Sequence, residues 1–349
     1  MKIRAAVLAV IVAASLVPLA SPASAIPPRA KVRKYKMGLN FPVDMAWVPK
    51  TRTVYFTEKN TGRIRILRGR RLKKRPCARL NVNSTGERGL LGIVLHPNFK
   101  KNRYLYVYFT KASPLQHQVK RFTVRRGRCR NPKVIVGGIS ASSGGYHNGG
   151  QIEFAGGKLY VSTGEQHQPG LAQQTDNRLG KILRYNPSGS VPNTNPFGNA
   201  VWSYGHRNPF GLAHKPGTTI IYSTENGRNC DDEFNVIKKG RNYGWGNGYE
   251  CGTRGVGPNP KRPEVRWRNI IVPTDPAFYR GKLKVLNGDV YTGDFHGRIH
   301  RLIMNRKDSR VRKRRVILRG QNGITDVMKG PGGWLYFATT NGIKRIVRK

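Results

Sequence analysis

The chain has 349 residues, of which 64 are Lys or Arg and only 17 are Asp or Glu, so its formal net charge is +47 at pH 7. This length admits two ordinary domains or one large all-β domain. Beyond the first 25 residues, no stretch approaches the roughly 20 apolar residues of a membrane helix. Nor is any helical pattern long enough for a βαβ crossover, which argues against an α/β fold.

The first 25 residues have the pattern of a secretory signal peptide. Lys2 and Arg4 give a charged start, residues 5–14 are apolar, and 23–25 read Ala-Ser-Ala, a small-residue cleavage site. We therefore expect export, with residues 1–25 removed and residues 26–349 forming a single domain outside the cytoplasm.

A two-strand phrase then recurs six times along the chain. Each copy has an apolar strand around a tyrosine, then a turn, then a second strand with aliphatic and mostly cationic residues. The copies are 53–57 with 62–67, 103–109 with 118–122, 157–162 with 180–185, 219–223 with 233–237, 288–292 with 297–302, and 333–338 with 342–347. Repetition at roughly 50 residues per unit is typical of propeller blades. The sequence thus predicts an all-β, six-bladed β-propeller of four-stranded antiparallel blades, which removes exposed sheet edges by ring closure.

Four cysteines allow three pairings after export. Pairs Cys77–Cys129 and Cys230–Cys251 are favoured because each spans one connecting region. The alternative is four free, buried thiols. Their spacing is not that of a zinc site.

The basic residues cluster in turns and edges, as in 68–75 and 310–315. Such a surface attracts polyanions, including anionic cell-surface polymers. The alternative is that the charge provides solubility alone. The basic runs belong to no DNA-reading motif, so sequence-specific nucleic-acid binding is not expected.

Several segments between the strands are richer in His, Asn, Gly and Arg than strand building requires. They are 87–99, 146–154, 179–187 with 191–197, 204–213, and 225–235 with 242–246. In this order and spacing the chain resembles the quinoprotein sugar dehydrogenases, the soluble glucose and aldose-sugar (glucose/sorbosone) dehydrogenases. The resemblance extends from Phe41 to the end of the chain.

The resemblance implies a central funnel that holds pyrroloquinoline quinone (PQQ) over a calcium ion. The family's base histidine corresponds to His147, which precedes Gly149 and Gly150. An imidazole suits a general base because its ordinary pKa lies near neutrality. On its own, His147 would be read as a turn or core histidine.

The resemblance also assigns cofactor contacts to Glu87, Arg207, Asn208 and Asn226. A guanidinium beside the quinone oxygens would stabilise negative charge that develops there, so Arg207 also counts as a catalytic residue. The alternative for Arg207 and Asn208 is a structural turn fixed by Pro209.

Four of the scarce acidic residues fall within residues 225–233. In the family, calcium rests on backbone carbonyls that correspond to Gly227 and Arg228. Glu225 and Asp232 are further candidate ligands, since calcium prefers oxygen. The alternative is that these carboxylates balance nearby arginines.

One departure from the family lies in the last repeat. Glucose-oxidising members carry two arginines there that hold the cofactor carboxylates, whereas this chain has Gly323 and Thr325. Other cations would have to replace them, and the chain offers Lys282, Lys284, Arg298 and Lys329.

The sequence therefore predicts an exported PQQ- and calcium-dependent enzyme that oxidises an aldose-type sugar. The alternative is a non-catalytic secreted propeller that binds anionic polymers or carbohydrate through its basic surface. A propeller hydrolase or lactonase is a third possibility, although no Gly-x-Ser-x-Gly phrase supports a serine nucleophile.

Overall fold

The computed structural model describes residues 30–349, so the expected signal peptide lies outside the described residues. Strands β1 to β25 dominate this part of the chain. Its helical segments have only three to five residues: α1 (Phe99–Asn102), α2 (Pro169–Gln173), η1 (Lys284–Leu286) and η2 (Pro331–Gly333). None of the described helices is long and apolar enough to cross a membrane. The predicted all-β class is confirmed.

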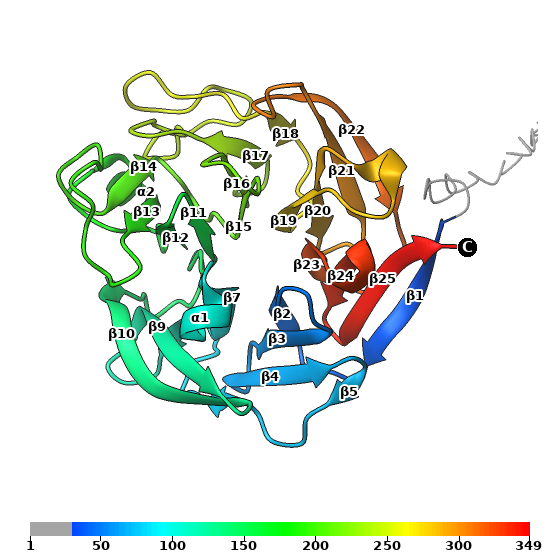
Figure 1. The fold of residues 1–349 in the computed structure, drawn as a ribbon. Helices are drawn as coiled ribbons and strands as arrows, with labels where there is room; N and C mark the ends of the chain where they lie inside the picture. The colour runs from blue at the N-terminus through cyan, green and yellow to red at the C-terminus, as the bar shows by residue number, and fades with distance from the viewer. Residues whose placement is uncertain (1–29) are drawn as a thin grey trace, which may run out of the picture.

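The sheets are arranged in a ring, with their inner strands around a common centre (Figure 1). The first sheet contains β2 (Pro42–Trp47), β3 (Thr53–Glu58), β4 (Arg63–Arg68) and β5 (Arg71–Leu72), with β6 (Ala78–Arg79) paired to β4. The second contains β7 (Leu90–Leu95), β8 (Tyr104–Lys111), β9 (Gln116–Arg125) and β10 (Arg128–Ser140).

Two further four-stranded sheets continue the ring. The third sheet contains β11 (Ile152–Ala155), β12 (Lys158–Thr163), β13 (Lys181–Tyr185) and β14 (Val201–Tyr204). The fourth contains β15 (Gly211–His214), β16 (Ile221–Glu225), β17 (Asp232–Ile237) and β18 (Val265–Trp267).

The last sheet has eight strands. They are β19 (Pro273–Tyr279), β20 (Asp289–Asp294), β21 (Ile299–Met304), β22 (Val311–Leu318), β23 (Ile324–Lys329), β24 (Leu335–Thr339), β25 (Gly342–Arg348) and β1 (Ala30–Met37). Strands β19–β22 form one antiparallel run, and β23, β24, β25 and β1 form another. One parallel residue pair, Asp275 with Asp326, joins the two runs.

The fold is therefore propeller-like, but the prediction of six separate four-stranded blades needs correction. The described residues form five sheets, four with four or five strands and one with eight. The physical reason is the single bridge between inner strands β19 and β23, which merges two runs into one hydrogen-bonded sheet.

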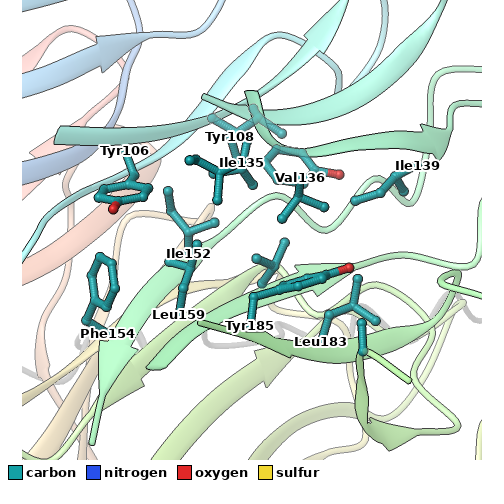
Figure 2. Close-up of a cluster of buried hydrophobic side chains, with 14 of the residues drawn as sticks. Tyr106, Tyr108, Ile135, Val136, Ile139, Ile152, Phe154, Leu159, Leu183 and Tyr185 are labelled. Carbon is teal, nitrogen blue, oxygen red and sulfur yellow. The ribbon is translucent and has the colours of Figure 1, made fainter. Parts of the chain in front are cut away.

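The repeated tyrosine lies on the strand next to the inner one in each run and packs between sheets. Its six copies are all buried: Tyr55, Tyr106, Tyr160, Tyr222, Tyr291 and Tyr336. Figure 2 shows one such core, in which Tyr106 and Phe154 meet with ring centroids 5.1 Å apart between the second and third sheets. The core is thus divided into inter-sheet layers, which leaves the ring centre to the inner strands.

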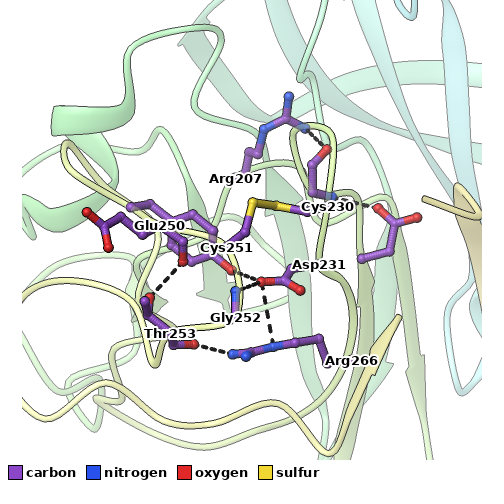
Figure 3. Close-up of a disulfide and its surroundings, with 11 residues drawn as sticks. Arg207, Cys230, Asp231, Glu250, Cys251, Gly252, Thr253 and Arg266 are labelled. Atoms are coloured by element: carbon purple, nitrogen blue, oxygen red, sulfur yellow. Dashed lines mark hydrogen bonds and ion pairs between the residues drawn. A yellow bond between two sulfur atoms is a disulfide. The ribbon is translucent and has the colours of Figure 1, made fainter. Parts of the chain in front are cut away.

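Both favoured disulfide pairings are confirmed. Cys77, in the loop before β6, bonds to Cys129 on β10 and so links the first sheet to the second. Cys230 bonds to Cys251 and fastens a long loop of the fourth sheet near Arg207 (Figure 3).

Candidate functional site

The segment between β10 and β11 holds His147 in a strained conformation. Its φ is +51°, and its side chain is buried. Gly149 follows at φ +61°, and a Cβ there would lie 2.7 Å from the Ser162 carbonyl oxygen. Only glycine therefore lets this segment approach β12 so closely, which fixes the position of His147.

Three groups surround His147. Its Nδ1 hydrogen-bonds to Oε1 of Glu165, which lies after β12 and is buried. Its backbone N–H donates to Glu87 Oε2 at 2.8 Å, and its ring stacks on that of His167 with centroids 4.0 Å apart. A proton on Nδ1 facing Glu165 makes Nε2 the basic nitrogen of the neutral ring. The site thus contains a histidine oriented by a carboxylate.

Glu165 was not foreseen from the sequence, although it is one of few acidic residues and follows a strand directly through Gly164. Its second oxygen, Oε2, is buried and has no hydrogen-bond partner. Burial and the neighbouring His147 lower the pKa of His167. A neutral His167 can stack on His147 without charge repulsion.

Asn208 connects the histidine segment to the next sheet. Its Oδ1 accepts a hydrogen bond from Gly149 N at 3.0 Å, and its Nδ2 donates to Glu87 Oε2 at 3.2 Å. Glu87 therefore receives hydrogen bonds from both His147 and Asn208. Three residues that the sequence predicted as neighbours meet here.

Arg207 lies beside this network and is buried. Its Nη1 donates to the carbonyl oxygens of Asn226 at 2.9 Å and Gly227 at 2.6 Å, and its guanidinium lies 5.3 Å from the centre of the Trp245 ring. Burial lowers the pKa of Arg207, and nearby carboxylates offset part of this effect. Its Nε has no hydrogen-bond partner, so the group keeps a donor for a ligand.

The two candidate acidic ligands mainly organise the backbone. Glu225 accepts hydrogen bonds from the backbone N–H of Arg207 and from His206 Nδ1, the latter at 2.9 Å. Asp232 accepts three backbone N–H groups, from Gly227, Ile271 and Val272.

The expected calcium carbonyls lie in the same loop. The carbonyl oxygen of Gly227 accepts a hydrogen bond from Arg207, and Arg228 is exposed. These contacts give the loop a structural role, and the assignment of a metal to it stays a prediction.

A cavity of about 330 Å³ opens next to these residues, within the size range of small-molecule sites. Its wall brings together three of the residues predicted to contact a cofactor: Glu87, Asn208 and Asn226. Arg207 borders a smaller adjoining pocket that also includes Asn226. The cavity wall reaches Glu87, one hydrogen bond from His147.

Aromatic and cationic groups complete the wall. The rings of Phe41 and Phe295 have centroids 6.4 Å apart, and Lys59 Nζ lies 5.9 Å from the Phe41 ring centre. Lys59 Nζ also donates to the carbonyl oxygens of Ser84 and Gly86, and its burial lowers its pKa. The sequence did not single out Lys59, because it lies in a β-turn far from the motifs.

The proposed replacements for the missing arginines lie elsewhere. Lys329 lines a second cavity, Lys282 lies 5.6 Å from the Trp334 ring centre, and Arg298 pairs with Asp294. Lys284 lies in η1, outside the cavity wall.

Gly323 and Thr325 occupy the positions of the two family arginines, and Thr325 lines the cavity. A Cβ on Gly323 would lie 3.3 Å from the Phe295 ring. A phenyl ring thus packs against the position where the family's first arginine would begin.

The fold and site together define an all-β propeller with a buried histidine–carboxylate pair beside a cavity. The sequence profile of the Glucose / Sorbosone dehydrogenase family matches residues 39–348, and the chain belongs to this family.

Named relatives support that assignment. Aldose sugar dehydrogenase YliI of Escherichia coli is 28% identical over 356 residues, which cover 93% of this chain and 94% of the relative. Quinoprotein glucose dehydrogenase B of Acinetobacter calcoaceticus is 33% identical over 246 residues, covering 60% of this chain and 51% of the relative. The PQQ-bound structure of aldose sugar dehydrogenase from Streptomyces coelicolor superposes with a TM-score of 0.80 and 28% identity, covering 93% of this chain and all of that one.

Proposed function

We propose that the protein is an exported PQQ-dependent dehydrogenase that oxidises a hydroxyl group of an aldose-type sugar. The observation that carries the proposal is the His147–Glu165 pair beside a cavity lined by Glu87, Asn208 and Asn226. The family and the PQQ-bound relative support the cofactor.

His147 is the general base in this proposal. Its Nε2 accepts the proton of the sugar hydroxyl, while Glu165 holds Nδ1 and stabilises the imidazolium that forms. PQQ, when bound, supplies the two-electron hydride acceptor for the carbon-bound hydrogen. The exposed ring of Tyr146, beside His147, offers an aromatic surface on which a sugar face can pack.

The residues around the cavity fit a planar, anionic quinone. Phe41 and Phe295 offer apolar faces for a ring system, and Lys59 offers a cation for a carboxylate. Arg207 has an unpartnered Nε, and Asn226 has an unpartnered, buried Oδ1. Asn226 lines the cavity and Arg207 lines the adjoining pocket, so a polar ligand that reaches both could satisfy these two atoms.

Calcium is the second cofactor in the proposal, with the carbonyl oxygens of Gly227 and Arg228 as its protein ligands. The Gly227 oxygen already accepts a hydrogen bond from Arg207 at 2.6 Å. Calcium binding there therefore requires the guanidinium to turn away, and no chemical step above depends on it.

The eight-stranded sheet is counted as two blades in this proposal. Its two antiparallel runs of four strands share one bridge, which supports a count of six runs, five with four strands and the first with β6 as a fifth strand. The signal-like start of the sequence supports export, with residues 26–349 as one propeller domain.

Reconstitution tests the proposal directly. The purified chain is titrated with PQQ in the presence and absence of calcium, and dye reduction is then measured with a panel of aldoses. We expect wild type to bind PQQ stoichiometrically and to reduce the dye when sugar is added. His147→Asn should bind PQQ but should not reduce the dye. Failure of PQQ to bind at any calcium concentration would exclude the proposed activity.

The alternative of polyanion binding rests on the net charge. Residues 312–315 of edge strand β22 are all cationic and all exposed. Charges on an edge strand also prevent edge-to-edge association, so this stretch has a structural explanation. Salt-dependent binding of heparin-like polymers, measured on the same preparation, separates the two roles.

A further inference from the structure

Three buried aspartates meet at the centre of the ring. Asp44, Asp275 and Asp326 lie on the inner strands β2, β19 and β23. The residue before each of them lines the 330 Å³ cavity: Val43, Thr274 and Thr325. The aspartates themselves line a second cavity of about 550 Å³. The triad therefore lies between the two cavities.

The spacing of the triad suits one metal ion. One carboxylate oxygen from each aspartate lies within 4.8 Å of the others. Calcium binds oxygen at about 2.3–2.6 Å, so three ligand oxygens spread evenly around one ion are about 4.0–4.5 Å apart. A single calcium can therefore contact all three carboxylates with small side-chain shifts.

The electrostatic surroundings of the triad are acidic. The three aspartates are at most 8% exposed, and the nearest negative charges are those of one another and of Glu153. Buried carboxylates this close must either share protons or pair with a cation.

Backbone N–H groups already hold each carboxylate in place. Asp44 Oδ2 accepts from Ile93 N at 2.6 Å, and Asp275 Oδ1 accepts from Leu212 N at 2.8 Å. Asp326 Oδ2 accepts from Met45 N at 3.1 Å. Each bond crosses to another sheet, and each ionised carboxylate has further lone pairs for a metal.

Gln151 supplies an independent observation. It is only 3% exposed, its side chain hydrogen-bonds to the Asp44 carboxyl, and its Oε1 has no hydrogen-bond partner. Oε1 would come within 2.6 Å of a Cβ at position 92, where the chain has glycine. Gln151 thus contacts one member of the triad, Asp44, through its side-chain amide. Exchange of the amide oxygen and nitrogen would turn the unpartnered oxygen toward that carboxylate, where it can serve as a calcium ligand.

From this geometry we infer that Asp44, Asp275 and Asp326 bind a divalent cation, best matched by calcium, with Gln151 as a fourth oxygen donor. Water from the 550 Å³ cavity completes the coordination shell. The ion ties the first sheet to both runs of the eight-stranded sheet, so its role is to stabilise the closed ring. This site is separate from the Gly227 loop and does not depend on the proposed activity.

The test uses full-length protein stripped with a chelator and free of PQQ. Calcium is titrated while the melting temperature and the bound calcium, by native mass spectrometry, are recorded. We expect calcium to raise the melting temperature of wild type, and Asp275→Asn to abolish that rise and weaken this binding at least about 10-fold. Asp289→Asn is the matched control, because Asp289 is a buried carboxylate paired with Arg301.

Two results would overturn the inference. One is an unchanged calcium response in Asp275→Asn, which would assign the ion to another loop. The other is a wild type without a calcium response, together with Asp275→Asn more stable than wild type in chelator, as expected for three acids that share protons.

A crystallographic readout keeps the inference testable if Asp275→Asn fails to fold. Wild-type crystals soaked in calcium should show an anomalous peak about 2.4 Å from oxygens of all three carboxylates. Absence of that peak at saturating calcium would also refute the site.

Discussion

Glu165 accepts a hydrogen bond from Nδ1 of His147, and both side chains are buried. The bond joins the segment before β11 to the segment after β12, which the close approach of Gly149 to Ser162 makes possible. The carboxylate sets the orientation of the ring, so Glu165 determines that Nε2 is the nitrogen left free to accept a proton.

We expect Glu165→Gln to lower the kcat of sugar oxidation by about 10²-fold or more, because an amide cannot stabilise the imidazolium. PQQ affinity should change little, since Glu165 lies outside the cavity wall. Steady-state kinetics and quinone titration measure the two effects. Glu264→Gln, a carboxylate paired with Lys261, is the control. A Glu165→Gln enzyme with wild-type kcat would remove the carboxylate from the mechanism.

Lys59 is expected to bind a cofactor carboxylate. Lys59→Met removes a charge-assisted contact that contributes roughly 1.5–3 kcal/mol, so the Kd for PQQ should rise about 10–150-fold. Lys282→Met is the control, because Lys282 packs on Trp334 away from the cavity. Equal Kd values for both variants would show that other groups hold the quinone.

The two disulfides are expected to differ in effect. Cys230→Ser/Cys251→Ser and Cys77→Ser/Cys129→Ser should each lower the free energy of unfolding by about 2–4 kcal/mol. Only loss of the Cys230–Cys251 disulfide should also weaken PQQ binding. The neighbouring Asp231 accepts hydrogen bonds from Tyr249 and Gly252 and pairs with Arg266, close to Arg207 (Figure 3). Denaturant unfolding and quinone titration on both variants check this, and loss of affinity in both would indicate a general loosening of the fold.

His117 makes stability depend on pH. Burial, together with the Arg88 charge, lowers the pKa of folded His117 to about 3 from 6.5. Its Nε2 accepts from Gln166 Nε2 at 2.9 Å, and its Nδ1 meets Thr110 Oγ1 at 2.9 Å, which suits the neutral ring. Between these two pKa values the unfolded chain binds the extra proton. The contribution is therefore complete above pH 6.5 and is lost as pH falls toward 3.

The slope of this contribution approaches about 1.4 kcal/mol per pH unit. We expect the free energy of unfolding of His117→Gln to fall less steeply than that of wild type between about pH 6 and pH 4. His296→Gln, at an exposed ring, should keep the wild-type slope. Parallel curves for His117→Gln and wild type would show that His117 has the same pKa in the folded and the unfolded chain.

The repeat was enough to predict a ring of sheets because its tyrosine marks a buried position in every copy. The merging of two runs was not predictable, since it depends on one bridge between Asp275 and Asp326, residues with no local pairing pattern. Both disulfides followed from connecting regions that bring their ends together.

Only those site residues that belong to the family-like motifs could be predicted from the sequence. Glu87, Asn208 and Asn226 do border one cavity, and His147 shares a hydrogen-bonding partner with Asn208. Lys59 was missed because the arrangement of the sheets, not sequence proximity, brings its turn to the cavity. Glu165 was missed because the antiparallel pairing of β11 with β12 places it beside His147, 18 residues away. None of the four cations that the sequence offered in place of the missing arginines lines the cavity, whereas Lys59 does. The Phe295 ring packs against Gly323.

The ring is closed without a covalent bond, by antiparallel pairing of β1 with β25 (Figure 1). Ala30 at the start of β1 pairs with Arg348 at the end of β25, so the two ends of the described chain leave the ring at the same point. A force that pulls these ends apart loads the β1–β25 hydrogen bonds one after another, as in the opening of a zipper. The propeller should therefore open mechanically at this seam, and a short linker between residues 30 and 348 would let new chain ends be cut at an outer turn such as Arg126–Gly127.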